Sequence, residues 1–132
     1  MVRILIADDH KAARDNLREV LNQQQPQWEV SEASSGQEAV DVFRAAAPDV
    51  AVLDIVMMPV GGVAAAYEMR RIDPKAKIVL ISGHYAPGEA SLITRLLGAG
   101  AFVAKSDAVR QLVPTIQRIL SEENPILETP IA

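Results

Sequence analysis

The stretch Arg3-Ile4-Leu5-Ile6-Ala7-Asp8-Asp9 is a short apolar run that ends in two consecutive acids. Two further runs also end in a charged residue: Val50-Ala51-Val52-Leu53 ends at Asp54, and Phe102-Val103-Ala104 ends at Lys105. Short continuous apolar runs are typical of strands that are buried on both faces, as in parallel sheets covered by helices. Ligands of open parallel sheets bind outside the carboxyl ends of the strands. The pattern therefore predicts a crevice lined by acids and a lysine.

The rest of the chain alternates between apolar runs and patterns of helical spacing. The second strand is expected to begin at Trp28-Glu29-Val30, and the fourth to span residues 77–82. The helical patterns are bounded by capping residues, prolines and glycines. They run from Ala13 to Leu21, from a Ser34 or Ser35 cap to Pro48, from Gly62 to Asp73, from Pro87 to Gly98, and onward from a Ser106 or Asp107 cap.

Strands separated by helices imply right-handed crossovers and a three-layer α/β sandwich. We expect a flavodoxin-like (βα)5 fold whose five-stranded parallel sheet has the order 2-1-3-4-5. This order makes the first and third strands neighbours, so it places Asp8 and Asp9 next to Asp54.

The last helical pattern has the clearest periodicity. Its predicted buried stripe consists of Val109, Leu112, Val113, Ile116, Ile119 and Leu120. Pro114 lies within the pattern and is expected to bend the helix or to delay its regular start. From Glu122 the chain turns polar and contains prolines. We therefore expect one domain over residues 1–121 and a tail, or the start of an interdomain linker, over residues 122–132.

Composition excludes several classes of function. The 132 residues suit one domain, and a net charge of −4 argues against direct binding of nucleic acid. The absence of cysteine excludes a disulfide framework, a thiol nucleophile and a thiolate metal site. No apolar run reaches the length of a membrane helix, and no signal peptide is recognisable, so a cytoplasmic protein is expected.

Three acids at one edge of a sheet repel one another unless a cation lies among them. A hard cation such as Mg²⁺ prefers oxygen ligands, and carboxylates from two neighbouring strands with a main-chain carbonyl would suit it. Asp8 and Asp9 could instead cap the first helix. The third acid, Asp54, favours the metal site.

A carboxylate at the tip of a strand can also act as a nucleophile. Asp54, close to a metal and to Lys105, could attack phosphorus and carry an acyl phosphate. The metal and the ammonium group would stabilise the charge on the phosphoryl oxygens, and the hydroxyl of Ser82 could bind one of them. Ser82 or Lys105 alone would be an ordinary strand-end residue, so the prediction depends on the complete set.

Four segments together resemble the receiver domain of bacterial two-component response regulators. They are residues 4–10, 48–54, 78–82 and 98–105, and the resemblance extends over essentially residues 1–121. It implies that Asp54 is the phosphoacceptor. It also implies a Mg²⁺ (or Mn²⁺) ion bound by Asp9, Asp54 and the main-chain carbonyl of Val56, and by Asp8 through water.

The same resemblance assigns the remaining site residues. Ser82 and Lys105 would bind the phosphoryl group, and Ser82 with Phe102 would form the switch. Val56 and His84 occupy positions that tune hydrolysis of the acyl phosphate in this family. Because Val56 is apolar and cannot orient water, we expect a long-lived phosphorylated state.

Three departures from the family pattern stand out. Pro59 follows Met57-Met58 and so comes one residue later than the usual proline, while the spacing to Gly62 is kept. Phe102 has no hydroxyl, so its switching would be steric only. Ser106 replaces the proline that often follows the lysine, which resembles the subgroup with helix-turn-helix output domains.

The implied function is a phosphorylation-dependent signalling switch. A sensor histidine kinase would supply the phosphoryl group, and the surface of the fourth helix, fifth strand and fifth helix would change to control an output domain in transcription regulation. The chain would be a phosphoacceptor that assists its own phosphoryl transfer and dephosphorylation, and not an enzyme. A homodimer could form through the same surface, and DNA would be contacted only by an output domain that this chain does not contain.

Other classes fit the residues less well. Residues 8–10 partly match the Asp-x-His motif of cobalamin-binding domains, but Ala13 stands where that motif has glycine. An aspartate-nucleophile phosphatase would need a second acid at His10, which we interpret as a first-turn helix residue. A phosphate-independent, receiver-like interaction module remains the main alternative.

Overall fold

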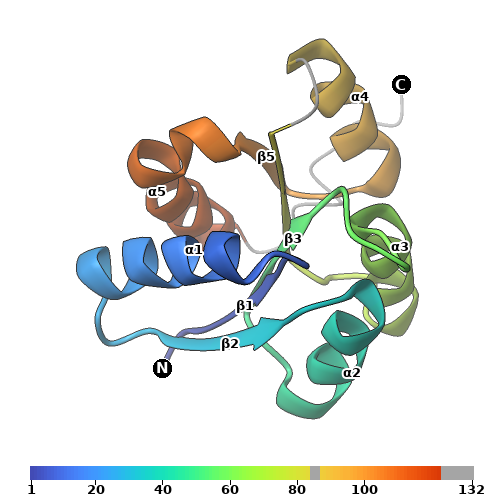
Figure 1. Ribbon diagram of the computed structural model, residues 1–132. Helices are drawn as coiled ribbons and strands as arrows, with labels where there is room; N and C mark the ends of the chain where they lie inside the picture. Colours follow the sequence, from blue (N-terminus) through green and yellow to red (C-terminus); the bar gives the residue numbers. More distant parts are fainter. Residues whose placement is uncertain (84–86, 123–132) are drawn as a thin grey trace.

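Five parallel strands form the middle layer of the molecule (Figure 1). The computed structural model describes residues 1–83 and 87–122. Its strands are β1 (Arg3–Ala7), β2 (Glu29–Ala33), β3 (Val50–Asp54), β4 (Ile78–Ser82) and β5 (Ala101–Ala104). They are arranged in the order β2-β1-β3-β4-β5, and every neighbouring pair is parallel. The predicted three-layer sandwich and its strand order are confirmed.

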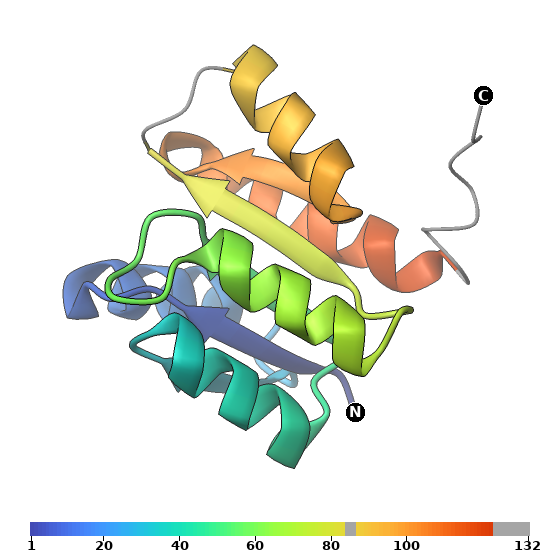
Figure 2. The ribbon, with the colours of Figure 1, turned by 90° about the vertical axis from the view of Figure 1, so that its right-hand side faces the viewer.

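Helices cover both faces of the sheet (Figures 1 and 2). They are α1 (Lys11–Gln24), α2 (Gly36–Ala46), α3 (Gly62–Ile72), α4 (Pro87–Leu97) and α5 (Ala108–Ser121), and a 3-10 turn, η1 (Lys105–Asp107), precedes α5. α1 and α5 lie on one face, and α2, α3 and α4 lie on the other. No described helix is long and apolar enough to span a membrane.

The side chains of each strand point alternately to the two faces of the sheet, and they divide the core into two clusters. Ile4 and Ile6 of β1 pack toward α1 and α5, whereas Leu5 and Ala7 pack toward α2 and α3. Successive side chains of a strand point to opposite faces, so a strand between two helical layers must be apolar throughout. This requirement explains the continuous apolar runs in the sequence.

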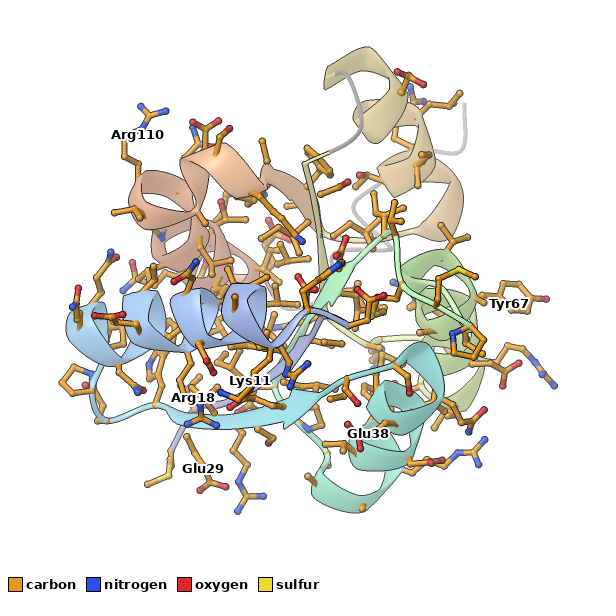
Figure 3. All side chains as sticks on the ribbon, viewed as in Figure 1. Lys11, Arg18, Glu29, Glu38, Tyr67 and Arg110 are labelled. Carbon is orange, nitrogen blue, oxygen red and sulfur yellow. The ribbon has the colours of Figure 1, made fainter. Side chains whose placement is uncertain are left out.

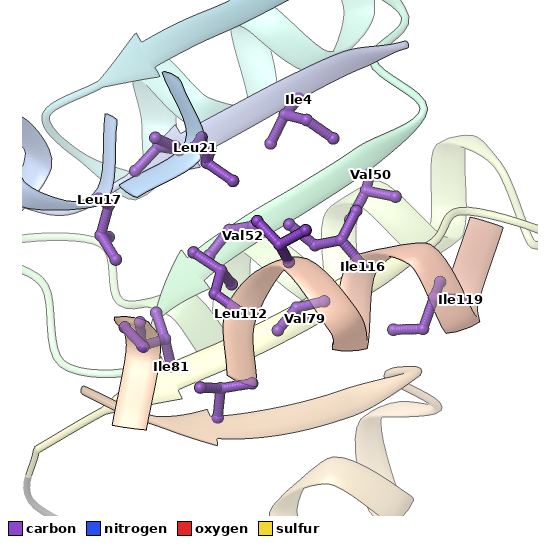
Figure 4. Packing of buried hydrophobic residues seen from close by; sticks show 14 of the residues in the cluster. Ile4, Leu17, Leu21, Val50, Val52, Val79, Ile81, Leu112, Ile116 and Ile119 are labelled. Carbon is purple, nitrogen blue, oxygen red and sulfur yellow. The ribbon is translucent and has the colours of Figure 1, made fainter. Parts of the chain in front are cut away.

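Isoleucine, leucine and valine side chains form most of the core on the α1 and α5 side of the sheet (Figure 4). Leu112, Ile116 and Ile119 of α5 are fully buried, and they pack with Val52 and Val79 of the sheet. Burying each of these α5 side chains stabilises the fold by about 1.5–3 kcal/mol. α5 continues through Pro114 as a single helix.

Val109 does not belong to the buried stripe on which the sequence pattern placed it. Its side chain is 66% exposed. Val109 lies in the first turn of α5, where a groove between α1 and α5 stays open and is lined by Ala13, Val20 and Val109. The side chain of Gln24 donates a hydrogen bond to the Val109 carbonyl across this groove (2.9 Å).

The predicted helix caps are confirmed in part. Ser35 caps α2 by accepting a hydrogen bond from the N–H of Glu38 (3.1 Å). Asp107 occupies the N-cap position of α5, but its carboxylate accepts a hydrogen bond from Arg110 and does not cap the helix. The N-cap residue of α1 is His10, and its side chain makes no capping hydrogen bond. The alternative in which Asp8 or Asp9 caps this helix is therefore wrong.

Candidate functional site

The sheet brings the polar strand ends to one edge. β1 pairs with β3 up to Ala7 and Leu53, and β4 pairs with β5 up to Ser82 and Ala104. Because the strands are parallel and in register, the residues at their carboxyl ends are neighbours. These residues are Asp8 and Asp9 after β1, Asp54 at the end of β3, Ser82 at the end of β4, and Lys105 after β5.

Lys105 joins the acids of two strands. Its Nζ lies 2.8 Å from Oδ2 of Asp8 and 2.9 Å from Oδ2 of Asp54. Asp8 is fully buried and Asp54 is only 3% exposed, so two desolvated carboxylates share one ammonium group. The cluster keeps an excess of buried negative charge, which is costly without a further cation.

The pKa values show the same imbalance. Burial raises the pKa of Asp54, and the hydrogen bond and charge of Lys105 offset this only in part. Burial by itself would lower the pKa of Lys105, but the nearby carboxylates of Asp8 and Asp54, of which Asp54 accepts a hydrogen bond, outweigh this effect and raise it. The surroundings therefore favour the charged form of Lys105, while burial disfavours the ionised form of Asp54.

Asp9 and His10 lie beside this pair. Oδ2 of Asp9 accepts a hydrogen bond from the N–H of Met58 (3.3 Å). Oδ1 of Asp9 is buried and makes no hydrogen bond within residues 1–83 and 87–122, although His10 Nδ1 lies 3.0 Å away. An unsatisfied buried carboxylate oxygen next to excess negative charge fits the binding of a divalent cation.

His10 was not among the metal ligands expected from the sequence. The structure places potential ligand atoms of Asp8, Asp9 and His10 within 4.8 Å of one another. The sequence held one hint, since a histidine directly follows the two acids. Whether such a histidine faces the acids depends on its side-chain rotamer.

The loop after β3 holds Asp54 by its other oxygen. Oδ1 of Asp54 accepts a hydrogen bond from the N–H of Val56 (3.1 Å), and the side chain of Val56 is exposed. Gly62 begins α3 so close to Asp54 that an added Cβ would lie within 2.1 Å of the Asp54 carbonyl oxygen. A residue larger than glycine at position 62 would therefore displace the end of β3 or the start of α3. The sequence pattern showed only that the spacing between Asp54 and Gly62 matches the family.

The predicted switch residues lie in different surroundings. Ser82 is buried at the end of β4. Phe102 is partly buried and packs against the cluster on the α2, α3 and α4 face, to which Ile93 of α4 also belongs. His84 lies outside the described residues, as does the predicted tail from residue 123 onward.

Comparison with known proteins gives a consistent result. The family model described as "Response regulator receiver domain" matches residues 4–117. The chain is 32% identical to the chemotaxis protein CheY of Thermotoga maritima over 120 residues, which cover 89% of this chain and 96% of that protein. It is also 32% identical to the response regulator UvrY of Escherichia coli over 123 residues, which cover 92% of this chain but only 55% of UvrY.

Solved structures agree with these matches. A LuxR-family two-component response regulator from Aurantimonas sp. SI85-9A1 superimposes with a TM-score of 0.84 and 29% identity, covering 97% of this chain and 94% of that one. A CheY-like receiver domain from Methanospirillum hungatei superimposes with a TM-score of 0.82 and 26% identity, covering 98% of this chain and 99% of that one.

Proposed function

The chain belongs to the family of response regulator receiver domains, and we propose that Asp54 is the residue that accepts the phosphoryl group. Receiver domains are phosphoacceptors, and switching by phosphorylation is the function of the family. The observation that carries the assignment is the position of Asp54, which ends a buried strand at the edge of the sheet and contacts Lys105 through its carboxylate (2.9 Å).

We assign the metal site to residues around Asp54. Receiver domains generally bind Mg²⁺ in an acidic pocket, and the unsatisfied oxygen of Asp9 supports such a site here. Asp9, Asp54 and the main-chain carbonyl of Val56 would hold Mg²⁺ (or Mn²⁺), with Asp8 acting through water. When bound, the cation supplies positive charge that stabilises the phosphoryl oxygens during transfer.

Asp54 performs the chemical step. One of its carboxylate oxygens attacks the phosphorus of a kinase phosphohistidine. The new O–P bond forms as the N–P bond breaks, and the imidazole leaves with the bonding electrons. Lys105 shifts its hydrogen bonds from the two carboxylates toward the phosphoryl oxygens. Val56 and His84 then set the access of water to the acyl phosphate, and so how far the protein assists its own dephosphorylation.

The output follows from the same site. The new phosphoryl group draws the hydroxyl of Ser82 toward it, and Phe102 fills the space that Ser82 leaves. The surface of α4, β5 and α5 changes as a result. A histidine kinase is the partner that supplies the phosphoryl group.

The chain spans about half the length of its relative UvrY. We propose that residues 1–121 form a receiver in a longer transcription regulator, that residues 122–132 begin the linker to its DNA-binding domain, and that the α4, β5 and α5 surface forms a homodimer.

Intact mass spectrometry after incubation with acetyl phosphate tests the assignment of Asp54. A gain of one phosphoryl group that needs Mg²⁺ and is absent in Asp54→Asn is the expected result. A gain that persists in Asp54→Asn would move the acceptor elsewhere. No gain, together with no binding of metal, would instead favour a phosphate-independent interaction module.

A further inference from the structure

We propose that Arg14 is a positioning residue that holds the Asp8–Asp9 turn, and with it the metal ligands, against β2. The inference rests on the metal site proposed above. The Arg14 side chain is only 16% exposed, although it lies on the first helix after the turn. Its Nη1 donates a hydrogen bond to the main-chain carbonyl of Asp8 (2.9 Å), and its Nε donates one to Oε1 of Glu32 on β2 (3.3 Å).

These bonds hold Asp8 from two sides. Its N–H donates to the carbonyl of Ala33, the last residue of β2 (3.1 Å), and its carbonyl accepts from Arg14. The carbonyl of Asp8 and the N–H of Asp9 belong to one planar peptide group. Fixing that carbonyl therefore fixes the peptide plane from which the Asp9 side chain starts.

Glu32 holds the guanidinium group of Arg14 in place. A charged hydrogen bond between a guanidinium and a carboxylate is stronger and more directional than a neutral one. Glu32 and Ala33 are neighbours on β2. The direct hydrogen bond of Asp8 to Ala33 and its indirect link through Arg14 to Glu32 therefore connect it to the same strand. The turn that carries Asp8 and Asp9 is thus anchored to the sheet by side chains as well as by the backbone.

Arg18 supplies an internal comparison. Its Nε also donates to Glu32. Its Nη2, however, donates to the carbonyl of Val30 (3.1 Å) and not to that of Asp8. Figure 3 shows Arg18 between α1 and β2. Arg14 and Arg18 have the same charge and share the same acid, and they differ in which carbonyl they hold.

A positioning role and a purely electrostatic role of Arg14 predict opposite changes in metal affinity when the arginine is removed. Removing one positive charge near a cation site would by itself strengthen the binding of the cation. Loss of a positioning contact behind metal ligands instead weakens it, by roughly 10–100-fold where such partners have been removed from other sites. Arg14→Gln is therefore expected to weaken metal binding, while Arg18→Gln leaves it unchanged or slightly stronger.

The experiment is a titration with Mn²⁺, in which electron paramagnetic resonance measures free Mn²⁺ and urea denaturation in EDTA measures stability. We expect Arg14→Gln to weaken Mn²⁺ binding about tenfold. Arg14→Lys should bind Mn²⁺ more tightly than Arg14→Gln but less tightly than the wild type. The Mn²⁺ affinity of Arg18→Gln should stay within about twofold of the wild type. Both glutamine variants leave Glu32 with one partner fewer, and the urea measurement separates a loss of stability from a loss of Mn²⁺ binding.

Unchanged binding in Arg14→Gln would overturn the proposal, and so would equal weakening in Arg18→Gln. If Arg14→Gln does not fold, Arg14→Lys decides, because it keeps the charge but cannot donate to both partners in the same geometry. Wild-type binding of that variant would then refute the proposal. Absence of Mn²⁺ binding in the wild type would overturn the metal site itself, which distinguishes failure of the proposed function from failure of the role of Arg14.

Discussion

At the scale of single residues, Asp54 is a buried acid that shares its lysine with another buried acid, Asp8. Burial in this arrangement disfavours the ionised form of Asp54 and raises its pKa. A cation beside Asp54 would lower this cost, as the proposed metal site requires.

The first prediction concerns pH. The folded-state pKa of Asp54 is raised, so between the unfolded value of about 3.9 and that raised pKa the folded protein holds a proton that the unfolded chain has lost. Stability from this group is therefore lost as pH rises through the raised pKa. In EDTA, the melting temperature of Asp54→Asn relative to the wild type should increase by a few degrees from about pH 4 to pH 7. A difference that stays the same at both pH values would contradict the burial of an ionised Asp54.

A second residue-scale prediction concerns the lifetime of the phosphorylated state. Val56 is exposed, lies two residues after Asp54 and has no polar atom in its side chain to orient an attacking water. Val56→Asn supplies such atoms and should shorten the half-life of the acyl phosphate several-fold, because the carboxamide can hydrogen-bond to the attacking water and orient it. Loss of the phosphoryl group followed by mass spectrometry checks this, with Val56→Ala as the control that adds no polar group. An unchanged half-life in Val56→Asn would contradict this role.

At the scale of elements, the start of α3 packs directly on the end of β3. An added Cβ at Gly62 would lie 2.1 Å from the Asp54 carbonyl oxygen and 2.8 Å from its carbon, so either the helix or the strand end would have to move. The N–H of Gly62 also donates to the carbonyl of Ile55 (3.0 Å), which keeps this junction tight.

Gly62→Ala is therefore expected to destabilise the fold by about 1–3 kcal/mol and to slow phosphorylation of Asp54. Gly88→Ala in α4 is the matched control, since nothing lies within 4 Å of a Cβ at that position. Alanine there should be neutral or stabilising by up to about 1 kcal/mol, because glycine is the poorer helix former. Urea denaturation of both variants, with acetyl phosphate kinetics, tests the comparison. Equal stability of the two would show that the junction can relax.

Across the whole molecule, the burial of α5 against the sheet and α1 varies along the helix. Ile116 is fully buried between α5 and the sheet, whereas Val109 is mostly exposed beside α1. Both residues belong to the stripe that the sequence pattern predicted to be buried. Their energetic contributions should differ accordingly.

Ile116→Ala is expected to cost about 2–5 kcal/mol, because it removes buried methyl groups and leaves a cavity. Val109→Ala should change stability by about 0.5 kcal/mol or less, as is usual for a surface position. Chemical denaturation of the two variants measures both values directly. A large loss in Val109→Ala would mean that the groove between α1 and α5 closes in solution.

The layers, the strand order and the set of strand-end residues could be predicted from the order of residues alone. Apolar runs, capping residues and punctuating glycines are local patterns, and the parallel arrangement places Asp8, Asp9, Asp54 and Lys105 at one edge without any knowledge of side-chain positions. The exposure of Val109 could not be predicted in this way, because a helical stripe shows which side chains share a face but not where a neighbouring helix stops covering it.

The contacts between these groups became visible only in the folded molecule. It showed that Lys105 bridges Asp8 and Asp54, and that Arg14 reaches from α1 to both Asp8 and Glu32. Most of these contacts join segments far apart in the chain, and all of them depend on side-chain rotamers. No local pattern carries that information, since it arises only when the sheet and its helices pack together.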